Sequence, residues 1–436
     1  MRIATGTLYE LGITGILQRQ QEVLKTQQQV SSGRRILTPS DDPIGSAAVL
    51  GVSQSKAVNE QYQRNIDIAG TVLASEDQAL SEATRVLQDI KVLAVNAGNM
   101  ALNDQDRQAL AVEARGLYQE MLGIANRADG DGNYLFAGYQ SATPPFSEAA
   151  PGSVNYVGDQ GQREVRISGS RAVAITDAGS AIFQNVRSGN GTFAAATGIG
   201  ANTGSGVVDA GRVTDPAKWN APANSRDFTV AFHVDNSVTP PLTTYDIVDN
   251  VNGVSLLTGA APAAGPHPRT YAPGAAISLK TRAPPDTNAT PFDFGAELSV
   301  DGAPANGDTF TVKPSTRLDV FSVMNNLINT MASGSGVSAA SHAGYRNQLN
   351  SAMLGLDHAL DTVLTTRAGV GARMKEADNA RGVAETLTLQ YAQRISGLED
   401  LDYAQALSDL TRRQFQLEAA QKSFKEVSTN SLFNYL

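Results

Sequence analysis

Apolar residues recur at intervals of three and four near both ends of this chain, and this spacing constrains the fold more than any other feature. Near the C-terminus the positions are Tyr403, Leu407, Leu410, Gln414, Leu417, Gln421 and Phe424. Near the N-terminus, Ile16, Val23 and Val30 recur every seven residues, with Gln20 and Gln27 close to the same line. This period is typical of a coiled-coil seam. We predict that the terminal segments pair with each other or with neighbouring copies; the alternative is two solvated helices of one bundle.

The chain falls into three zones by pattern. Residues 8–129 and 316–430 have a helical period, whereas residues 140–315 do not. Asn103 is placed to cap a helix, and the seven-residue repeat continues through Leu73, Leu80, Leu87 and Ala94. We predict an α+β fold: a long antiparallel helical bundle or coiled coil built from both termini, with a β-rich central insertion of one or two domains. The predicted divisions are 1–42 with 400–436, 43–135 with 316–399, and 136–315.

The middle zone carries strand and loop signals. Phe228, Val230, Phe232 and Val234 alternate with small or polar residues, as in a half-buried strand. Further short strands are predicted around Leu298 and Val300, Phe310 and Val312, and Val165 and Ile167. The stretch SGNGTFAAATGIGANTGSG (188–206) is rich in glycine and is predicted to be a surface loop. Helices resume at Thr316, because Thr316 and Asp319 have capping-box spacing.

A firm helix break interrupts the first zone within SSGRRILTPSDDPIGSA (31–47). Gly33 suits a left-handed C-terminal cap, and Pro39 prevents the helix from continuing. Asp42 can then cap a new helix with Pro43 at its first position, where the missing N–H costs nothing. Gly33, Pro39, Asp42 and Pro43 therefore predict a hinge between two helical layers.

Composition and charge exclude several classes of protein. The net charge is -9 and the basic residues are scattered, which argues against a general nucleic-acid binder. No apolar run approaches the roughly 18 residues that span a bilayer. The start, MRIATGTLYELG, lacks the apolar core of a cleaved signal peptide. The absence of cysteine fits either a cytosolic protein or an exported protein built without disulfides.

No residue set indicates catalysis, a metal or a cofactor. DGDGN (129–133) begins like a calcium loop, but Tyr134 and Gln140 occupy positions that require glycine and glutamate. GIGANTG (198–204) is one residue too long for a dinucleotide fingerprint. The histidines lie in unrelated contexts, and neither a zinc motif nor a serine-hydrolase elbow is present. We therefore predict a protein that is not an enzyme, with no catalytic, cofactor or metal site.

The break sequence resembles the N-terminal signature of the bacterial flagellin family, in particular its hook-associated members. DGNYLFAGYQ (131–140), RAGVGARM (367–374), LEDLDYAQALSDLTRRQFQLEAAQKSF (398–424) and the MRIATG start match the same type. The resemblance covers residues 1–140 and 316–436, and residues 185–290 resemble no segment of the family. Flagellins carry Asp-Asp-Ala-Ala-Gly where this chain has Asp41, Asp42 and Pro43.

The resemblance implies a structural junction protein of the bacterial flagellum that assembles between hook-associated protein 1 and the flagellin filament. It implies further partners: copies of the chain itself, and a type III export chaperone at the C-terminal segment. It also implies an extracellular location, reached without a cleaved signal. The residues expected in the assembly seam are Ile16, Val23, Val30, Leu407, Leu410, Leu417 and Phe424. The alternatives are a flagellin filament subunit and a surface adhesin that uses the central β-rich region.

Overall fold

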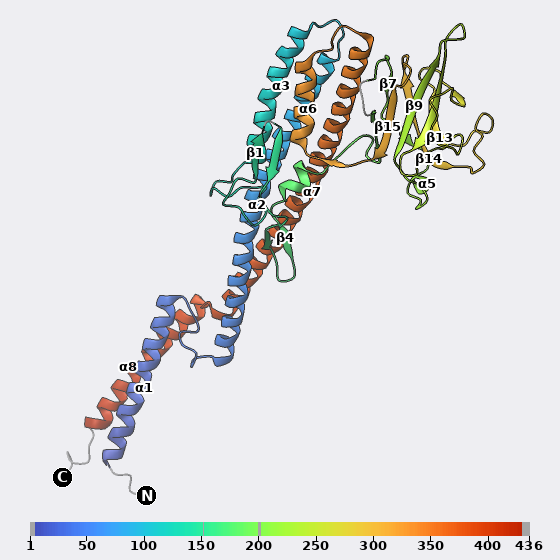
Figure 1. The fold of residues 1–436 in the computed structure, drawn as a ribbon. Coiled ribbons are helices and arrows are strands. Elements are labelled where there is room, and N and C mark those ends of the chain that lie inside the picture. The colour runs from blue at the N-terminus through green and yellow to red at the C-terminus, as the bar shows by residue number, and fades with distance from the viewer. Residues whose placement is uncertain (1–4, 151, 199–201, 430–436) are drawn as a thin grey trace, which may run out of the picture. The chain divides into compact units, whose positions relative to one another are not determined.

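The computed structural model describes residues 5–150, 152–198 and 202–429 of the chain, so the first four residues of the MRIATG start and part of GIGANTG lie outside the described residues. Contacts divide the chain into two compact units. The first contains the chain up to Asp67, the segment Arg166–Arg171 and the chain from Ala377 onward. The second contains Ile68–Val165 and Ala172–Glu376. Figure 1 shows the elements of both units.

The first unit is built from helices of both chain ends. Its members are α1 (Thr5–Ser32), the first part of α2 (Pro43–Ala97), the last part of α7 (Ala339–Glu399) and α8 (Tyr403–Thr429). The helices α1 and α8 lie side by side and antiparallel (Figure 1). Near one end of the pair, the rings of Tyr9 and Phe424 meet edge to face with centroids 5.7 Å apart.

The boundary between the two units lies inside α2 and α7, which differs from the predicted divisions at 42/43 and 399/400. The helix breaks lie at these two positions. However, the start of α2, after the first break, and the end of α7, before the second break, still pack within the first unit. Asn59 of α2 shows this, because its Nδ2 donates to the Ala384 carbonyl (2.6 Å) and to Thr388 Oγ1 (2.8 Å) on α7. A break in the helix therefore does not end a unit here.

The helical part of the second unit combines α2 and α7 with α3 (Asp104–Ala125) and α6 (Val320–Ser333). The predicted repeat Leu73, Leu80, Leu87 and Ala94 is buried in its core. Asn103 caps α3 in a capping box with Asp106, as predicted. The start of α6 corrects the sequence analysis: Asp319, rather than Thr316, is the N-cap and accepts a hydrogen bond from the Ser322 N–H (2.6 Å).

That correction has a simple cause, because β16 (Arg317–Leu318) pairs with β5 (Val186–Arg187) and keeps the chain extended up to the cap. The strand predicted around Val165 and Ile167 is confirmed as β3, but the residues before β5 pack differently from prediction. They form β1 (Phe146–Ala150), β2 (Ser153–Tyr156), β3 (Glu164–Arg166), β4 (Ala172–Ala174) and α4 (Gly179–Phe183). The rings of Phe146 and Phe183 pack against Phe321 of α6 and lie in the core of the helices. The independent β-rich core therefore begins after this segment, not at residue 136.

The β domain has a single hydrophobic core of its own, built from two sheets. The six-stranded sheet contains β6 (Phe193–Thr197), β9 (Phe228–Asp235), β10 (Leu242–Asp249), β11 (Val254–Ser255), β12 (Arg269–Thr270) and β15 (Thr309–Pro314). The four-stranded sheet contains β7 (Val207–Val208), β8 (Arg212–Val213), β13 (Ala276–Lys280) and β14 (Asp293–Asp301). The short α5 (Pro216–Trp219) places the only tryptophan of the chain, Trp219, in this core.

The strand predictions are confirmed for β9, β14 and β15, where alternate residues such as Phe228, Val230 and Phe232 are buried. The predicted loop at 188–206 is wrong in part, because it contains β6. Phe193 is fully buried, and Ala194–Ala196 pair with β15. Small side chains do not prevent a strand when a neighbouring strand supplies its hydrogen bonds.

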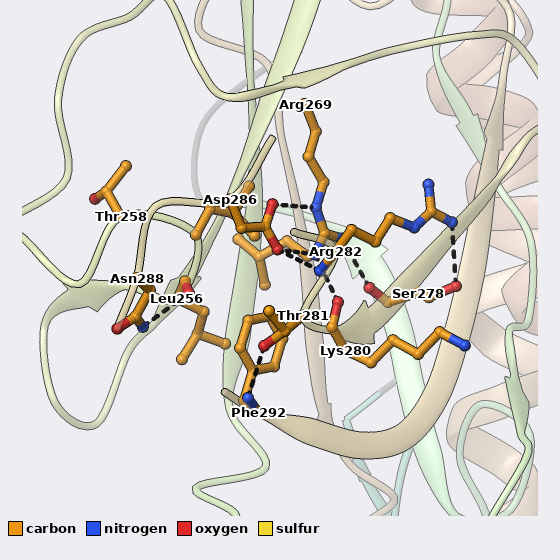
Figure 2. A network of polar contacts seen from close by, with 12 residues as sticks. Leu256, Thr258, Arg269, Ser278, Lys280, Thr281, Arg282, Asp286, Asn288 and Phe292 are labelled. Carbon is orange, nitrogen blue, oxygen red and sulfur yellow. Dashed lines mark hydrogen bonds and ion pairs between the residues drawn. The ribbon is translucent and has the colours of Figure 1, made fainter. Parts of the chain in front are cut away.

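A buried ion pair lies within the β domain. The side chains of Arg269 and Asp286 are 2% and 0% exposed. Arg269 Nε donates to Asp286 Oδ1 (2.9 Å), Nη2 donates to Oδ2 (2.6 Å), and Nη1 donates to the Ser278 carbonyl (3.0 Å). The Arg282 N–H also donates to Asp286 Oδ2 (2.7 Å), so both carboxylate oxygens of Asp286 accept hydrogen bonds (Figure 2).

None of the helices in the described part of the chain is both long enough and apolar enough to span a membrane.

Candidate assembly surface at the paired terminal helices

The first helix break has the geometry that its sequence predicts. Helix α1 ends at Ser32, and Gly33 follows with φ +72°, the left-handed conformation that favours glycine. The Gly33 N–H donates to the Gln29 carbonyl (2.9 Å), which closes the helix end. Asp42 Oδ1 accepts from the Gly45 N–H (2.8 Å), and Pro43 is the first residue of α2.

The loop between these caps is held by Asp41. Its Oδ2 accepts from the N–H groups of Leu37 (3.1 Å) and Thr38 (3.0 Å), and its Oδ1 lies 2.6 Å from Lys25 Nζ of α1. The Lys25 hydrogen bond, followed by the Thr38 N–H, lowers the pKa of Asp41 to about 2. Pro39 lies in the turn that Asp41 closes, where the Asp41 N–H donates to the Thr38 carbonyl (3.0 Å).

A second helix break, between α7 and α8, lies against the first. The Arg35 N–H donates to the Glu399 carbonyl (2.7 Å), and the Leu401 N–H donates to the Gly33 carbonyl (2.9 Å). Arg35 Nη2 also donates to the Leu398 carbonyl (2.6 Å), and Arg34 Nη1 lies 2.9 Å from Glu399 Oε1. The two breaks therefore form one joint that ties the α1 end of the chain to the α8 end.

The second break has only a weak signal in the sequence. The residues between α7 and α8, 400–402, include neither glycine nor proline. The detectable signal is Asp402, which accepts from the Gln405 N–H (3.1 Å) and caps α8. Arg34 and Arg35 link the two sides of the joint. Local sequence could not predict this role, because Arg35 and its partner Leu398 are 363 positions apart.

Six of the seven predicted seam residues are partly buried: Ile16, Val23, Val30, Leu410, Leu417 and Phe424. Leu407 is 50% exposed and is thus the one predicted seam residue that is not partly buried. The buried line on α8 instead passes through Ala406, and Arg413 donates from Nη1 to Thr26 Oγ1 (3.0 Å). The glutamines that the sequence analysis placed in the seams are all exposed: Gln20, Gln27, Gln414 and Gln421.

Large apolar side chains remain exposed on both terminal helices. They are Leu11, Ile13, Leu17 and Leu24 on α1, and Tyr403, Leu407, Phe415 and Val427 on α8. We call this set the exposed apolar residues of the termini. Large exposed apolar side chains are candidates for contact with another molecule. Within the described residues, both terminal helices therefore carry apolar surface that the chain does not cover.

Gly33→Ala is expected to lower the stability of the first unit by about 1–2 kcal/mol, because a residue with a Cβ pays that much for the left-handed conformation. The new Cβ would also lie 2.8 Å from Tyr403 Oη. Urea denaturation followed by far-UV circular dichroism measures the change. Gly15→Ala is the matched control: it lies in α1 with open space around it and gains up to about 1 kcal/mol of helix propensity. Equal effects of the two variants would contradict the assigned cap.

Paired terminal helices around an inserted β domain define the class to which the chain is similar. Residues 5–141 match the family described as "Bacterial flagellin N-terminal helical region". The resemblance to flagellin-type proteins that the break sequence predicted is confirmed by this match. The α+β architecture, with helices from both termini and antiparallel sheets between them, is confirmed as well.

Within this class, the chain is similar to flagellar hook-associated protein 3. It is 36% identical to that protein of Escherichia coli (strain K12) over 188 residues, which are 43% of this chain and 58% of the relative. The chain thus matches little more than half the length of this curated relative.

Two solved structures of flagellar proteins match a larger share of the chain. The flagellar hook associated protein-3 of Legionella pneumophila is 28% identical with a TM-score of 0.69, covering 80% of this chain and 98% of that one. FlgL of Xanthomonas campestris is 27% identical with a TM-score of 0.66, covering 79% and 99%.

Proposed function

We propose that this chain is a structural junction protein of the bacterial flagellum and acts by assembly, without catalysis. The observation that carries the proposal is the joined pair α1 and α8, with large exposed apolar residues on both helices. Neighbouring copies cover these residues. Each copy adds head to tail, which builds a helical layer instead of a closed dimer.

The proposed partners are further copies of the chain, hook-associated protein 1 on one side and flagellin on the other. Similarity to the flagellar junction protein FlgL of Legionella pneumophila, 28% identical over 81% of this chain, supports the position between hook and filament. The β domain has its own core and needs no neighbour to complete it, which suits a region that faces outward from the layer.

The similarity to flagellar proteins also supports proposals for the export and the location of the chain. The chain leaves the cell through the flagellar type III apparatus without a cleaved signal and functions outside the cell. An export chaperone binds the amphipathic α8 segment before export. Covering Leu407, Phe415 and Val427 there prevents early assembly, because those side chains are exposed in the chain by itself.

The second candidate is a flagellin filament subunit, which the match of residues 5–141 to the flagellin N-terminal region favours. Abundance separates the two roles, since a filament subunit is the main protein of sheared filaments and a junction protein is a trace component. Quantitative mass spectrometry of sheared filaments measures this ratio.

Deletion of the gene in its host tests the proposal. Electron microscopy should show hooks without filaments, and immunoblots should find unpolymerised flagellin in the medium. Missing filaments with no flagellin protein anywhere would support the filament-subunit role instead. Normal flagella and normal swimming in a strain with no second copy would contradict both roles.

A further inference from the structure

A carboxyl group is completely buried in the helical part of the second unit. The side chain of Glu76 on α2 is 0% exposed. Its Oε1 accepts a hydrogen bond from the Asp177 N–H (3.0 Å), while its Oε2 has no partner within the described residues. A buried carboxylate with one unpaired oxygen is costly, so this site favours the protonated acid.

The charges around Glu76 come from two other elements. Asp177 lies in the turn between β4 and α4, and Arg373 of α7 forms an ion pair with it. Arg373 Nη1 also donates to the Ala174 carbonyl (3.1 Å). Asp77, the neighbour of Glu76 on α2, is occupied by Arg367 of α7, whose Nε donates to it (2.7 Å). The Arg163 backbone holds the same turn, since its carbonyl accepts from the Ile175 N–H (2.7 Å).

Burial, and then the nearby Asp177 carboxylate, raise the pKa of Glu76 to about 8, whereas the Arg373 cation acts in the opposite direction. Arg373 is already engaged by Asp177 and Ala174, and Nε and Nη2 of the buried Arg163 guanidinium have no hydrogen-bond partner within the described residues, so neither arginine donates a hydrogen bond to Glu76 there. The acid therefore stays protonated at neutral pH and ionises in mildly alkaline solution.

We propose that Glu76 is a proton-dependent latch that holds strand β4 and the turn after it, residues 172–177, on helices α2 and α7. The segment is docked while Glu76 carries a proton. Ionisation places a second carboxylate charge beside Asp177, on a Glu76 side chain that is 0% exposed, and this repulsion favours release of the segment. Arg373, from the RAGVGARM stretch (367–374), also holds the segment on α7 through its contacts with Asp177 and the Ala174 carbonyl.

The direction of the pH effect follows from linkage. In the released state Glu76 meets water and regains its ordinary pKa, 4.5, whereas in the docked state its pKa is about 8. A group with a raised pKa in the docked state stabilises docking fully at low pH and loses that contribution as pH rises toward the docked pKa. Between the two pKa values, the equilibrium constant for release of the segment (the opening constant) rises about tenfold per pH unit.

Hydrogen exchange of the full chain, corrected for the intrinsic rate of exchange, measures this equilibrium at residues 172–177. In the wild type, the opening constant should rise about 100-fold between about pH 5.5 and about pH 7.5. Glu76→Gln keeps the shape of the protonated acid and cannot ionise, so its opening constant should stay constant within about twofold. Asp77→Asn is the matched control on the same helix and should keep the wild-type slope. Identical pH dependence in the wild type and Glu76→Gln overturns the latch.

Infrared spectroscopy of the wild type gives a test that does not need the glutamine variant to fold. A buried protonated carboxyl should be detected near neutral pH and lost as the solution becomes alkaline. Asp177→Asn removes the repelling carboxylate, so the loss should move to lower pH than in the wild type. A wild type without a protonated carboxyl near neutral pH, or an unchanged midpoint in the variant, overturns the proposal.

Discussion

Leu417→Asp is expected to abolish incorporation of the chain into flagella while the β domain stays folded. Leu417 is partly buried on α8, between Arg413, which binds Thr26, and Phe424, which contacts Tyr9. The substitution loses part of the roughly 1.5–3 kcal/mol that full burial of a leucine contributes, and it also places a carboxylate against α1. Isolated helices are only marginally stable in water, so we expect this loss of free energy to separate α1 from α8.

Complementation of the deletion strain, scored by electron microscopy of hooks and filaments, measures incorporation. Gln416→Asp adds the same charge to an exposed neighbouring position and should complement normally. Leu410→Asp should fail like Leu417→Asp. Fluorescence of Trp219 should be unchanged in all three variants, because this residue reports on the β domain alone. Normal incorporation of both leucine variants would reject the seam.

Leu407 separates contacts within the chain from contacts between copies. It is half exposed, so we expect Leu407→Asp to leave the helix content of the purified chain unchanged. Loss of incorporation in that variant would place Leu407 on the face that neighbouring copies cover.

The second large effect is expected from Asp286→Ala in the β domain. The substitution leaves the buried Arg269 guanidinium without its carboxylate, and loss of one partner from a buried pair costs about 3–5 kcal/mol. The Arg282 N–H loses its acceptor as well. Urea denaturation followed by Trp219 fluorescence should show a much earlier transition of this domain.

Asp293→Ala is the matched control for that experiment. Asp293 pairs with Lys218 at 2.6 Å, but both side chains are nearly half exposed. Pairs of this kind contribute about 0–1 kcal/mol. If the two alanine variants shift the transition equally, burial of the Arg269–Asp286 pair is not what stabilises the domain.

Local signals in the sequence predicted the elements whose causes are local. Gly33 ends α1 because of its backbone conformation, Asp42 and Pro43 begin α2, and Asn103 caps α3. The alternation from Phe228 to Phe232 predicted a strand for the same reason, since side-chain period and backbone state are linked within a few residues. The break signature also indicated the flagellin-type resemblance.

Partners that lie far apart in the chain decided the rest. A repeat of apolar residues identifies a helix face only to within about one position: Ala406 is buried and Arg413 binds Thr26 of α1, whereas Leu407 is half exposed. Strand β6 forms from a glycine-rich stretch because β15 supplies its hydrogen bonds. Glu76, Asp177 and Arg373 meet from three separate elements, and no local pattern predicts that meeting. The sequence by itself determined where helices begin and end and the period of their apolar faces, because backbone preference acts within a few residues. Tertiary structure decided which faces meet and which charges are buried, because those depend on shape complementarity between distant segments.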